Sequence, residues 1–219
     1  MPTEGKPMSN PAVEPEPAAA EALFGARIDL ARKFANALVE EGELRGLIGP
    51  LEPPRIWTRH ILNSAIAAPL FHGSVADVGS GAGLPGLVLA ISRPDVHWTL
   101  IEPMDRRVVW LNEQVVSLGL DNVTVMRARG EDVGLEFDVV TARAVSALRT
   151  LVPITAPLVK DGGELILLKG QNVDAEITAA QKVLKKHKVT NMSVEVLGED
   201  VLAETTRAFR AQVRATLTR

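Results

Sequence analysis

The sequence predicts an α/β fold with a mostly parallel, seven-stranded sheet and a helical N-terminal cap. From residue 74 onward, short apolar segments alternate with segments whose apolar residues recur at helical spacing. A glycine-rich turn, residues 79–86, follows the first apolar segment. The last two predicted strands have no room for a crossover helix between them, so they should pair as an antiparallel hairpin at the sheet edge. The length of 219 residues suits one domain with a small appendage.

The N-terminal part divides into a tail and a cap. Residues 1–20 contain five of the fourteen prolines and almost no large apolar side chains. Nothing there offsets the entropy lost on ordering, so we predict a disordered tail. Residues 21–72 form the predicted cap, with one helix marked by Phe24, Phe34 and Leu38 and a second from about residue 55 to 71. Residues 73–219 form the predicted sheet domain.

The elements of the sheet domain follow from local patterns. Leu84, Leu87 and Ile91 form a helical stripe after the glycine turn, Gly119 ends the next helix, and Gly162 begins the turn into the fifth strand. Repeated strand–helix units favour a parallel sheet. The predicted strands are 75–78, 97–101, 123–126, 137–141, 164–168, 189–197 and 207–213, and the helices are 84–91, 108–118, 147–159 and 173–186.

Composition narrows the possible functions. The chain has no Cys, which excludes a disulfide framework, a thiolate zinc site, an iron–sulfur cluster and a Cys nucleophile. It has no apolar run of membrane-spanning length and no signal-peptide pattern. We therefore expect a cytoplasmic protein that is monomeric, contacts no membrane and holds no metal.

The segment Asp77–Gly86 joins the first strand to its helix, where open α/β sheets bind ligands. Glycines there let the backbone approach a ligand closely. Gly81, Gly83 and Gly86 have the spacing of a dinucleotide fingerprint, with Glu102 placed as a ribose-binding acid. An NAD(P)-dependent oxidoreductase is therefore one alternative. Asp77 has a purely structural alternative, which is to cap N–H groups of its own loop.

Three features favour S-adenosylmethionine (SAM) as the ligand. Asp77 precedes the loop, where a carboxylate can meet the cationic amino-acid end of SAM. The alternate glycines from Gly79 to Gly83 start directly after the strand, whereas the dinucleotide glycines would start two residues late. The acidic segment Glu131-Asp132 follows the third strand, where an adenine-contacting loop belongs. The sequence therefore predicts a Rossmann-like, class I SAM-dependent methyltransferase fold.

Two cations stand at the ends of neighbouring strands and are the candidate catalytic residues. Arg143 ends the fourth strand and can hold a guanine edge or a phosphate, or else form an ion pair with Asp138 or Glu131. Lys169 ends the fifth strand and can contact a phosphate, or else be solvated. No motif for amine or pyrimidine C5 methylation is present, so elimination favours a ring nitrogen or another good nucleophile as acceptor. A small-molecule acceptor and a non-catalytic RNA-binding module remain alternatives.

Five segments together resemble one known family. The chain resembles the bacterial RsmG (GidB) family, which methylates N7 of a guanine in the 530 loop of 16S ribosomal RNA. The resemblance covers about residues 57–170 and continues loosely to the C-terminus. The matching segments are Arg59–Ser64, Asp77–Gly86, Arg106-Arg107, Arg143–Ser146 and Leu168–Gly170.

The resemblance implies SAM as methyl donor and the 16S rRNA of the small ribosomal subunit as partner. It implies SAM contacts at Gly79, Leu84, the Gly130-Glu131 pair and Arg143. The formal charge of −3 does not by itself favour an RNA partner, although the distribution of charge matters more than its sum. The candidate RNA-binding residues are Arg59, His60, Arg106 and Arg107.

Overall fold

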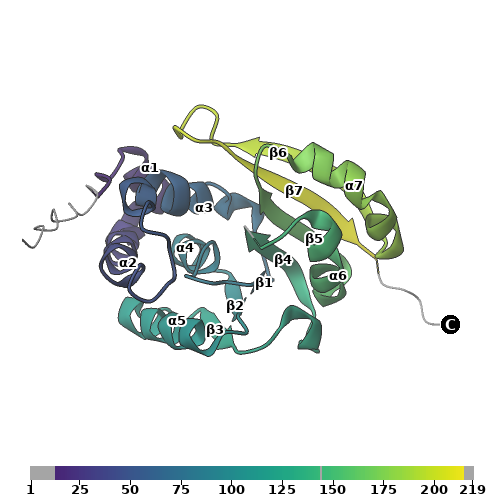
Figure 1. Ribbon diagram of the computed structural model, residues 1–219, viewed down its shortest axis with the longest axis horizontal. Coiled ribbons are helices and arrows are strands. Elements are labelled where there is room, and N and C mark those ends of the chain that lie inside the picture. Colours follow the sequence, from purple (N-terminus) through teal and green to yellow (C-terminus); the bar gives the residue numbers. More distant parts are fainter. Residues whose placement is uncertain (1–12, 144, 215–219) are drawn as a thin grey trace, which may run out of the picture.

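A seven-stranded sheet forms the centre of the molecule, as predicted. The computed structural model describes residues 13–143 and 145–214. The strand order is β3-β2-β1-β4-β5-β7-β6; the first five strands run parallel, and β7 is antiparallel to both its neighbours (Figure 1). The strands are β1 (Ser74–Val78), β2 (His97–Ile101), β3 (Val123–Met126), β4 (Phe137–Arg143), β5 (Val159–Lys169), β6 (Val189–Leu197) and β7 (Thr206–Val213).

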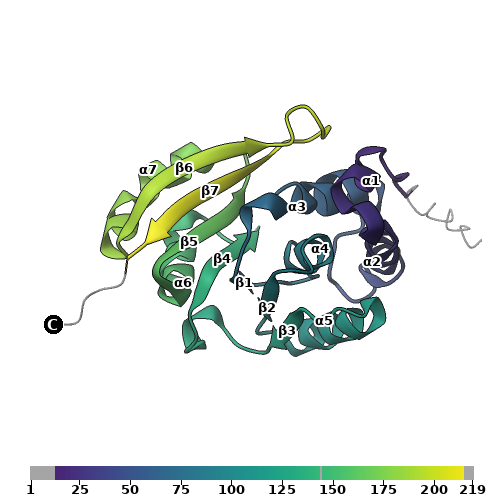
Figure 2. The same ribbon diagram turned by 180° about the vertical axis from the view of Figure 1, so that it is seen from behind.

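Helices cover both faces of the sheet, because the parallel strands are apolar on both sides. Side chains alternate along each strand: Val139 joins the core on the cap side, and the next residue, Val140, joins the opposite core. Figures 1 and 2 show α4 and α5 on one side and α6 and α7 on the other. These helices are α4 (Gly86–Ser92), α5 (Asp105–Leu118), α6 (Leu148–Thr155) and α7 (Val173–Lys186), with short 3₁₀ turns at Gly130–Asp132 and Ala156–Leu158.

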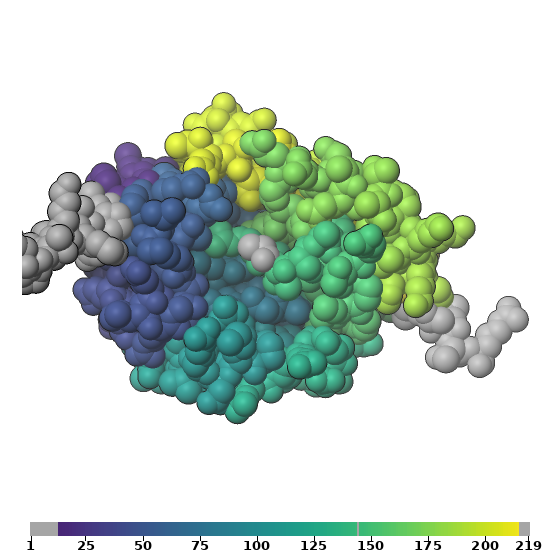
Figure 3. All heavy atoms as spheres, viewed as in Figure 1, coloured from purple at the N-terminus to yellow at the C-terminus, as the bar shows by residue number. Residues whose placement is uncertain are grey.

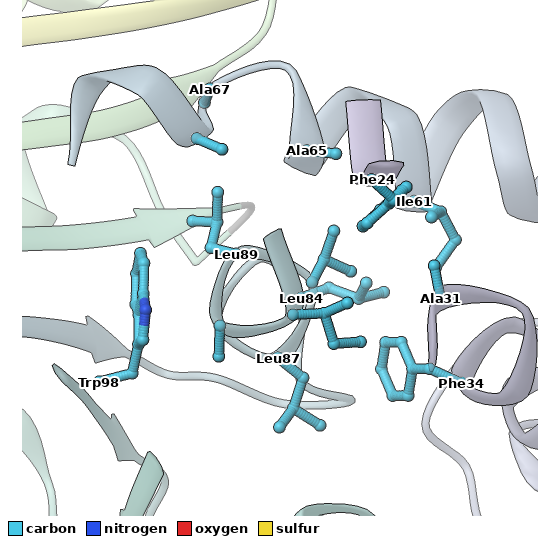
Figure 4. Close-up of a cluster of buried hydrophobic side chains, with 14 of the residues drawn as sticks. Phe24, Ala31, Phe34, Ile61, Ala65, Ala67, Leu84, Leu87, Leu89 and Trp98 are labelled. Atoms are coloured by element: carbon cyan, nitrogen blue, oxygen red, sulfur yellow. The ribbon is translucent and has the colours of Figure 1, made fainter. Parts of the chain in front are cut away.

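The cap packs onto α4 and shares its hydrophobic core. Figure 4 shows Phe24, Phe34 and Ile61 of the cap gathered around Leu84 and Leu87, and all five are buried. The predicted second cap helix is broken into short segments, one of them π-helical, where the sequence pattern suggested a continuous helix. The cap consists of α1 (Ala19–Phe24), α2 (Ile28–Glu41) and α3 (Asn63–Ala65), with short helical segments at Gly25–Arg27, Pro53–Arg55, Ile56–Leu62 and Ala68–Leu70.

Residues 13–20, which the sequence places in a solvated tail, contact the cap. The Glu14 carboxylate accepts hydrogen bonds from the backbone N–H groups of Trp57 (2.9 Å) and Thr58 (3.0 Å). Glu16 forms an ion pair with Arg32 at 2.7 Å. Two carboxylates anchor this segment, so polar contacts order it although it lacks large apolar side chains. Residues 1–12 of the predicted tail lie outside the described residues, and the division between residues 72 and 73 stays a prediction.

Over the described ranges, none of the helices has both the length and the apolar character that a membrane crossing requires.

Candidate functional site

The glycine loop presents bare backbone at the carboxyl end of β1. Gly79 and Gly81 have φ angles of 73° and 57°, in the left-handed region that favours glycine. The Gly79 and Ser80 N–H groups donate to the Ile101 carbonyl at 2.8 and 3.2 Å, which ties the loop to the end of β2. A Cβ on Gly81 would meet only the Gly79 carbonyl, at 3.8 Å. The loop is therefore fixed, and its backbone at Gly81 is open to a ligand.

A cavity of about 550 Å³ lies against this loop. Its volume is within the range of sites for cofactor-sized ligands. The cap contributes Leu47, Ile48 and Glu52 to its lining. Figure 3 shows a hollow bordered by the blue cap and the green second half of the chain. Of the predicted cofactor-binding residues, the cavity is lined by Gly79, Gly81, Leu84, Glu102 and Arg143.

Glu102 connects the loop to the end of β2. Its side chain is only 2% exposed. Oε2 accepts from the Gly81 N–H and Oε1 from the Met104 N–H, both at 2.9 Å. Nη1 of Arg107 lies 3.8 Å from Oε2, so Arg107 lines this cavity, although the sequence predicts an RNA contact for it. Arg106, the other member of that pair, is exposed.

Asp77 lies beneath the loop and does not line the cavity. Its Oδ2 accepts from the Gly86 N–H at 3.0 Å, which is the capping role we gave as its alternative. Its Oδ1 is buried without a hydrogen-bond partner among the described residues. Burial raises the pKa of Asp77 to about 7, against the opposing effects of Ser80, Gly86 and Arg143. A cationic ligand nearby would stabilise the ionised form.

Three more predicted cofactor residues lie away from the cavity lining. A Cβ on Gly83 would stand 2.4 Å from Leu87, so this glycine allows the loop to pack on α4. Gly130 is buried, and a Cβ there would stand 2.5 Å from Cγ2 of Ile154. Glu131 is exposed. The structure brings none of the three to the cavity, and their contact with SAM stays a prediction.

Arg143 stands between two cavities. It lines the cavity at the loop and a second one of about 500 Å³. Its guanidinium donates to the Arg59 carbonyl at 3.1 Å and to Nδ1 of His60 at 3.0 Å. Neither expected acidic partner binds it, because Asp138 pairs with Lys160 at 2.8 Å instead. Burial lowers the pKa of Arg143 to about 10, so it remains protonated at neutral pH.

Lys169 lines the second cavity and is not solvated. Its side chain is 8% exposed and pairs with Glu176 at 2.7 Å. Its ammonium also donates to the Ser146 carbonyl at 2.8 Å. Glu176 accepts in turn from the Leu148 N–H at 2.9 Å. Lys169 therefore holds the segment after β4 in place beside the cavity.

Several site residues carry no local sequence signal. They come from the cap, from α7 and from the segment that leads into β7, and a local sequence pattern does not show that these parts meet at the site. In the described part of the chain, no group of three His, Asp or Glu residues could hold a metal ion. The residues missed are Glu52, Asn63, Glu176, Thr205 and Thr206.

The sheet order, the glycine loop and the adjoining cavity define a class I SAM-dependent methyltransferase fold. A SAM-dependent O-methyltransferase from Thermotoga maritima has a TM-score of 0.54 at 17% identity, over 71% of this chain and 66% of that one. The N-methyltransferase NodS from Bradyrhizobium japonicum, in complex with S-adenosyl-L-homocysteine, has a TM-score of 0.55 at 13% identity, over 80% and 98%. Likeness at this identity shows the fold alone.

The family is narrower than the fold. A family model described as rRNA small subunit methyltransferase G (GidB) matches residues 27–206. The ribosomal RNA small subunit methyltransferase G of Leifsonia xyli is 64% identical over 205 residues, 92% of this chain and 98% of the relative. That of Clavibacter michiganensis is 58% identical over 204 residues, 92% and 97%. The chain belongs to the rRNA small subunit methyltransferase G family, which confirms the resemblance and sets aside the oxidoreductase alternative.

Proposed function

We propose that this protein transfers the methyl group of SAM to N7 of a guanine in the 530 loop of 16S ribosomal RNA. The observation that carries the proposal is the position of Arg143. One cation lines both the cavity at the glycine loop and a second cavity of about 500 Å³. Donor and acceptor can thus be held on either side of one side chain, within a family whose relatives are named as rRNA methyltransferases.

The residues of the first cavity fit SAM. The open backbone at Gly81 allows close approach, and the Glu102 carboxylate oxygens can accept from ribose hydroxyls. Oδ1 of Asp77 is buried without a hydrogen-bond partner within residues 13–143 and 145–214, and a cationic amino-acid end nearby would favour the ionised form of this carboxyl group. When bound, SAM supplies an electrophilic methyl group. The chain's own residues must align the acceptor and exclude water.

The acceptor chemistry suits a site without a general base. Guanine N7 has a free lone pair and carries no proton, so nothing has to remove one. O6 lies beside N7 on the same edge of the base and accepts hydrogen bonds. Arg143 would donate to O6 and leave the N7 lone pair free. Lys169 would act indirectly, by holding Ser146 beside the second cavity.

The RNA partner would approach from the side of the exposed arginines. Arg59 has a side chain 47% exposed and lines both cavities, while Arg106 is exposed at the start of α5. Both can contact phosphates, which position a nucleic acid without reading its sequence. We propose that the protein acts as a monomer in the cytoplasm, on the small ribosomal subunit, without a metal or a membrane.

The test is to map methylated nucleosides by mass spectrometry in ribosomal RNA from cells with and without this protein. We expect 7-methylguanosine in the 530 loop to disappear with the gene and to return on incubation of the purified subunits with protein and SAM. Unchanged 7-methylguanosine would refute the proposal. Methyl transfer to a small acceptor in the absence of RNA would support the small-molecule alternative.

A further inference from the structure

A chain of hydrogen-bonded side chains leads from the cap to Arg143. Nη2 of Arg143 lies 3.0 Å from Nδ1 of His60, and Nε2 of His60 lies 2.6 Å from Oε2 of Glu52. A guanidinium can only donate, so Nδ1 must be the acceptor. The imidazole proton is therefore on Nε2 and is donated to Glu52. The two neighbours of His60 select one neutral tautomer.

The charges of these groups agree with that tautomer. Burial lowers the pKa of His60, and Arg143 lowers it further, against the opposing effect of Glu52. Burial acts to raise the pKa of Glu52, but the hydrogen bond from His60 and two nearby arginines outweigh it, so the net shift is downward. At neutral pH, His60 is neutral and Glu52 is ionised. A protonated His60 would instead place a second cation against Arg143.

Neutral acceptors hold Arg143 without neutralising it. Its partners are the Nδ1 lone pair of His60 and the carbonyl oxygen of Arg59, and among the described residues no carboxylate forms an ion pair with it. Its remaining N–H donors and its full charge stay available at the boundary of the two cavities. A carboxylate in the place of His60 would fix the guanidinium equally well but would cancel that charge.

We propose that His60 is a positioning residue, which holds the Arg143 guanidinium between the two cavities, and that Glu52 fixes its tautomer. The sequence leaves two roles open for His60, an RNA contact and a helix residue that is hydrogen-bonded within the protein. Its side chain is 13% exposed and both ring nitrogens are engaged within the protein, so neither is free for RNA. The proposal is tested below by enzyme kinetics and by NMR. The kinetic measurement rests on the proposed function, whereas the NMR measurement does not.

Two matched variants separate the positioning role from an RNA contact. The Asn amide oxygen of His60→Asn can replace Nδ1 as the acceptor for Arg143. The longer amide of His60→Gln reaches toward Glu52 and leaves Nδ1 without a replacement. Steady-state kinetics with SAM and unmethylated small subunits should show kcat falling about tenfold or more in His60→Gln, with KM for the subunit within about twofold. His60→Asn should keep kcat within about threefold of wild type.

An RNA contact would instead raise KM for the subunit in both variants and leave kcat unchanged. That result would overturn the proposal, and so would an equal loss of kcat in both. Thermal unfolding and SAM affinity, measured for each variant, show whether a loss of kcat comes from misfolding.

The second measurement needs no substrate. Long-range ¹H–¹⁵N NMR spectra of the wild-type imidazoles, with His60 assigned by its absence in His60→Asn, should show the neutral Nε2–H tautomer at pH 7. A protonated ring or an Nδ1–H tautomer would overturn the proposal even if the variants proved inactive. If the wild type methylates no RNA, the proposed function fails, and the tautomer of His60 still decides whether the hydrogen-bonded chain from Glu52 to Arg143 exists.

Discussion

Replacement of Asp77 by Asn should stabilise the ligand-free protein at alkaline pH. Asp77 is fully buried, and its pKa is raised from 3.8 to about 7, chiefly by burial. The folded state therefore keeps a proton that the unfolded state releases at much lower pH. Since the folded state binds more protons in this window, stability falls as pH rises from about 4 to about 7, and then levels off. Asn carries no charge, so this fall should disappear.

The magnitude follows from the size of the shift. A rise from 3.8 to about 7 costs the fold about 4 kcal/mol at pH 8, at about 1.4 kcal/mol per unit. Asn keeps an acceptor for the Gly86 N–H, but places an NH₂ group where Oδ1 of Asp77 has no partner. That unpaired donor costs about 1–3 kcal/mol. We expect Asp77→Asn to be more stable by about 1–3 kcal/mol at pH 8 and close to wild type at pH 5.

Urea unfolding of both proteins at pH 5 and pH 8, without SAM, measures this difference directly. Comparison of the variant with the wild type at the same pH cancels the titration of all other groups. At pH 8, SAM should also protect Asp77→Asn less than the wild type, because the cationic end of SAM loses the attraction of a buried carboxylate beneath the loop. A difference in stability that stays the same at the two pH values, or a variant less stable than wild type at pH 8, would show that burial does not raise the pKa of Asp77 in this way.

Three other substitutions and one control variant test the loop and its surroundings. Gly81→Asp adds a side chain where the backbone is open to the cavity, so SAM affinity measured by calorimetry should fall about tenfold or more, about 1.4 kcal/mol. Gly119→Asp is the matched control, because Gly119 has a φ of 62°, close to the 57° of Gly81, and open space around it. This control variant should bind SAM with wild-type affinity. Equal SAM affinities for the two variants would show that the position of Gly81 at the cavity does not matter. Glu102→Ala leaves the N–H groups of Gly81 and Met104 without their acceptor, so SAM binding should weaken by about 1–3 kcal/mol in the same assay. Wild-type SAM affinity in this variant would count against the proposed cofactor site. Gly130→Ala would place Cβ 2.5 Å from Cγ2 of Ile154 and should lower the free energy of unfolding by about 1–3 kcal/mol, whereas an unchanged value in urea would show that the contact relaxes freely.

The fold and the part of the candidate site at the strand ends could be predicted, because their sequence signals are local. Strand–helix alternation and the glycine loop of residues 79–86 are visible within short windows of sequence. The carboxyl ends of parallel strands meet at one edge of a sheet, so the sequence alone places Glu102, Arg143 and Lys169 near one another. Glu102 lines the cavity at the glycine loop, Lys169 lines the second cavity, and Arg143 lines both.

The rest of the candidate site depends on contacts between segments that are distant in the sequence. His60 and Arg143 are 83 positions apart, and their hydrogen bond requires the cap to lie against the end of β4. The Glu14 carboxylate accepts a hydrogen bond from the N–H of Trp57, which lies 43 positions further along the chain. The sequence leaves two roles open for Asp77, a contact with SAM and a cap on the N–H groups of its own loop. The hydrogen bond from the Gly86 N–H confirms the capping role, and the contact with SAM stays a prediction. No short window of sequence shows that the cap lies against the end of β4, or which of its two roles Asp77 takes.

A crystal structure of the protein with S-adenosylhomocysteine would show whether the glycine loop and Glu102 hold the cofactor. We expect the adenosyl group to lie against the backbone of residues 79–84, with its ribose hydroxyls on the Glu102 carboxylate and its amino-acid end toward Arg143 and the second cavity. A cofactor bound elsewhere, or a cavity closed by the protein's own side chains at saturating ligand, would contradict this expectation.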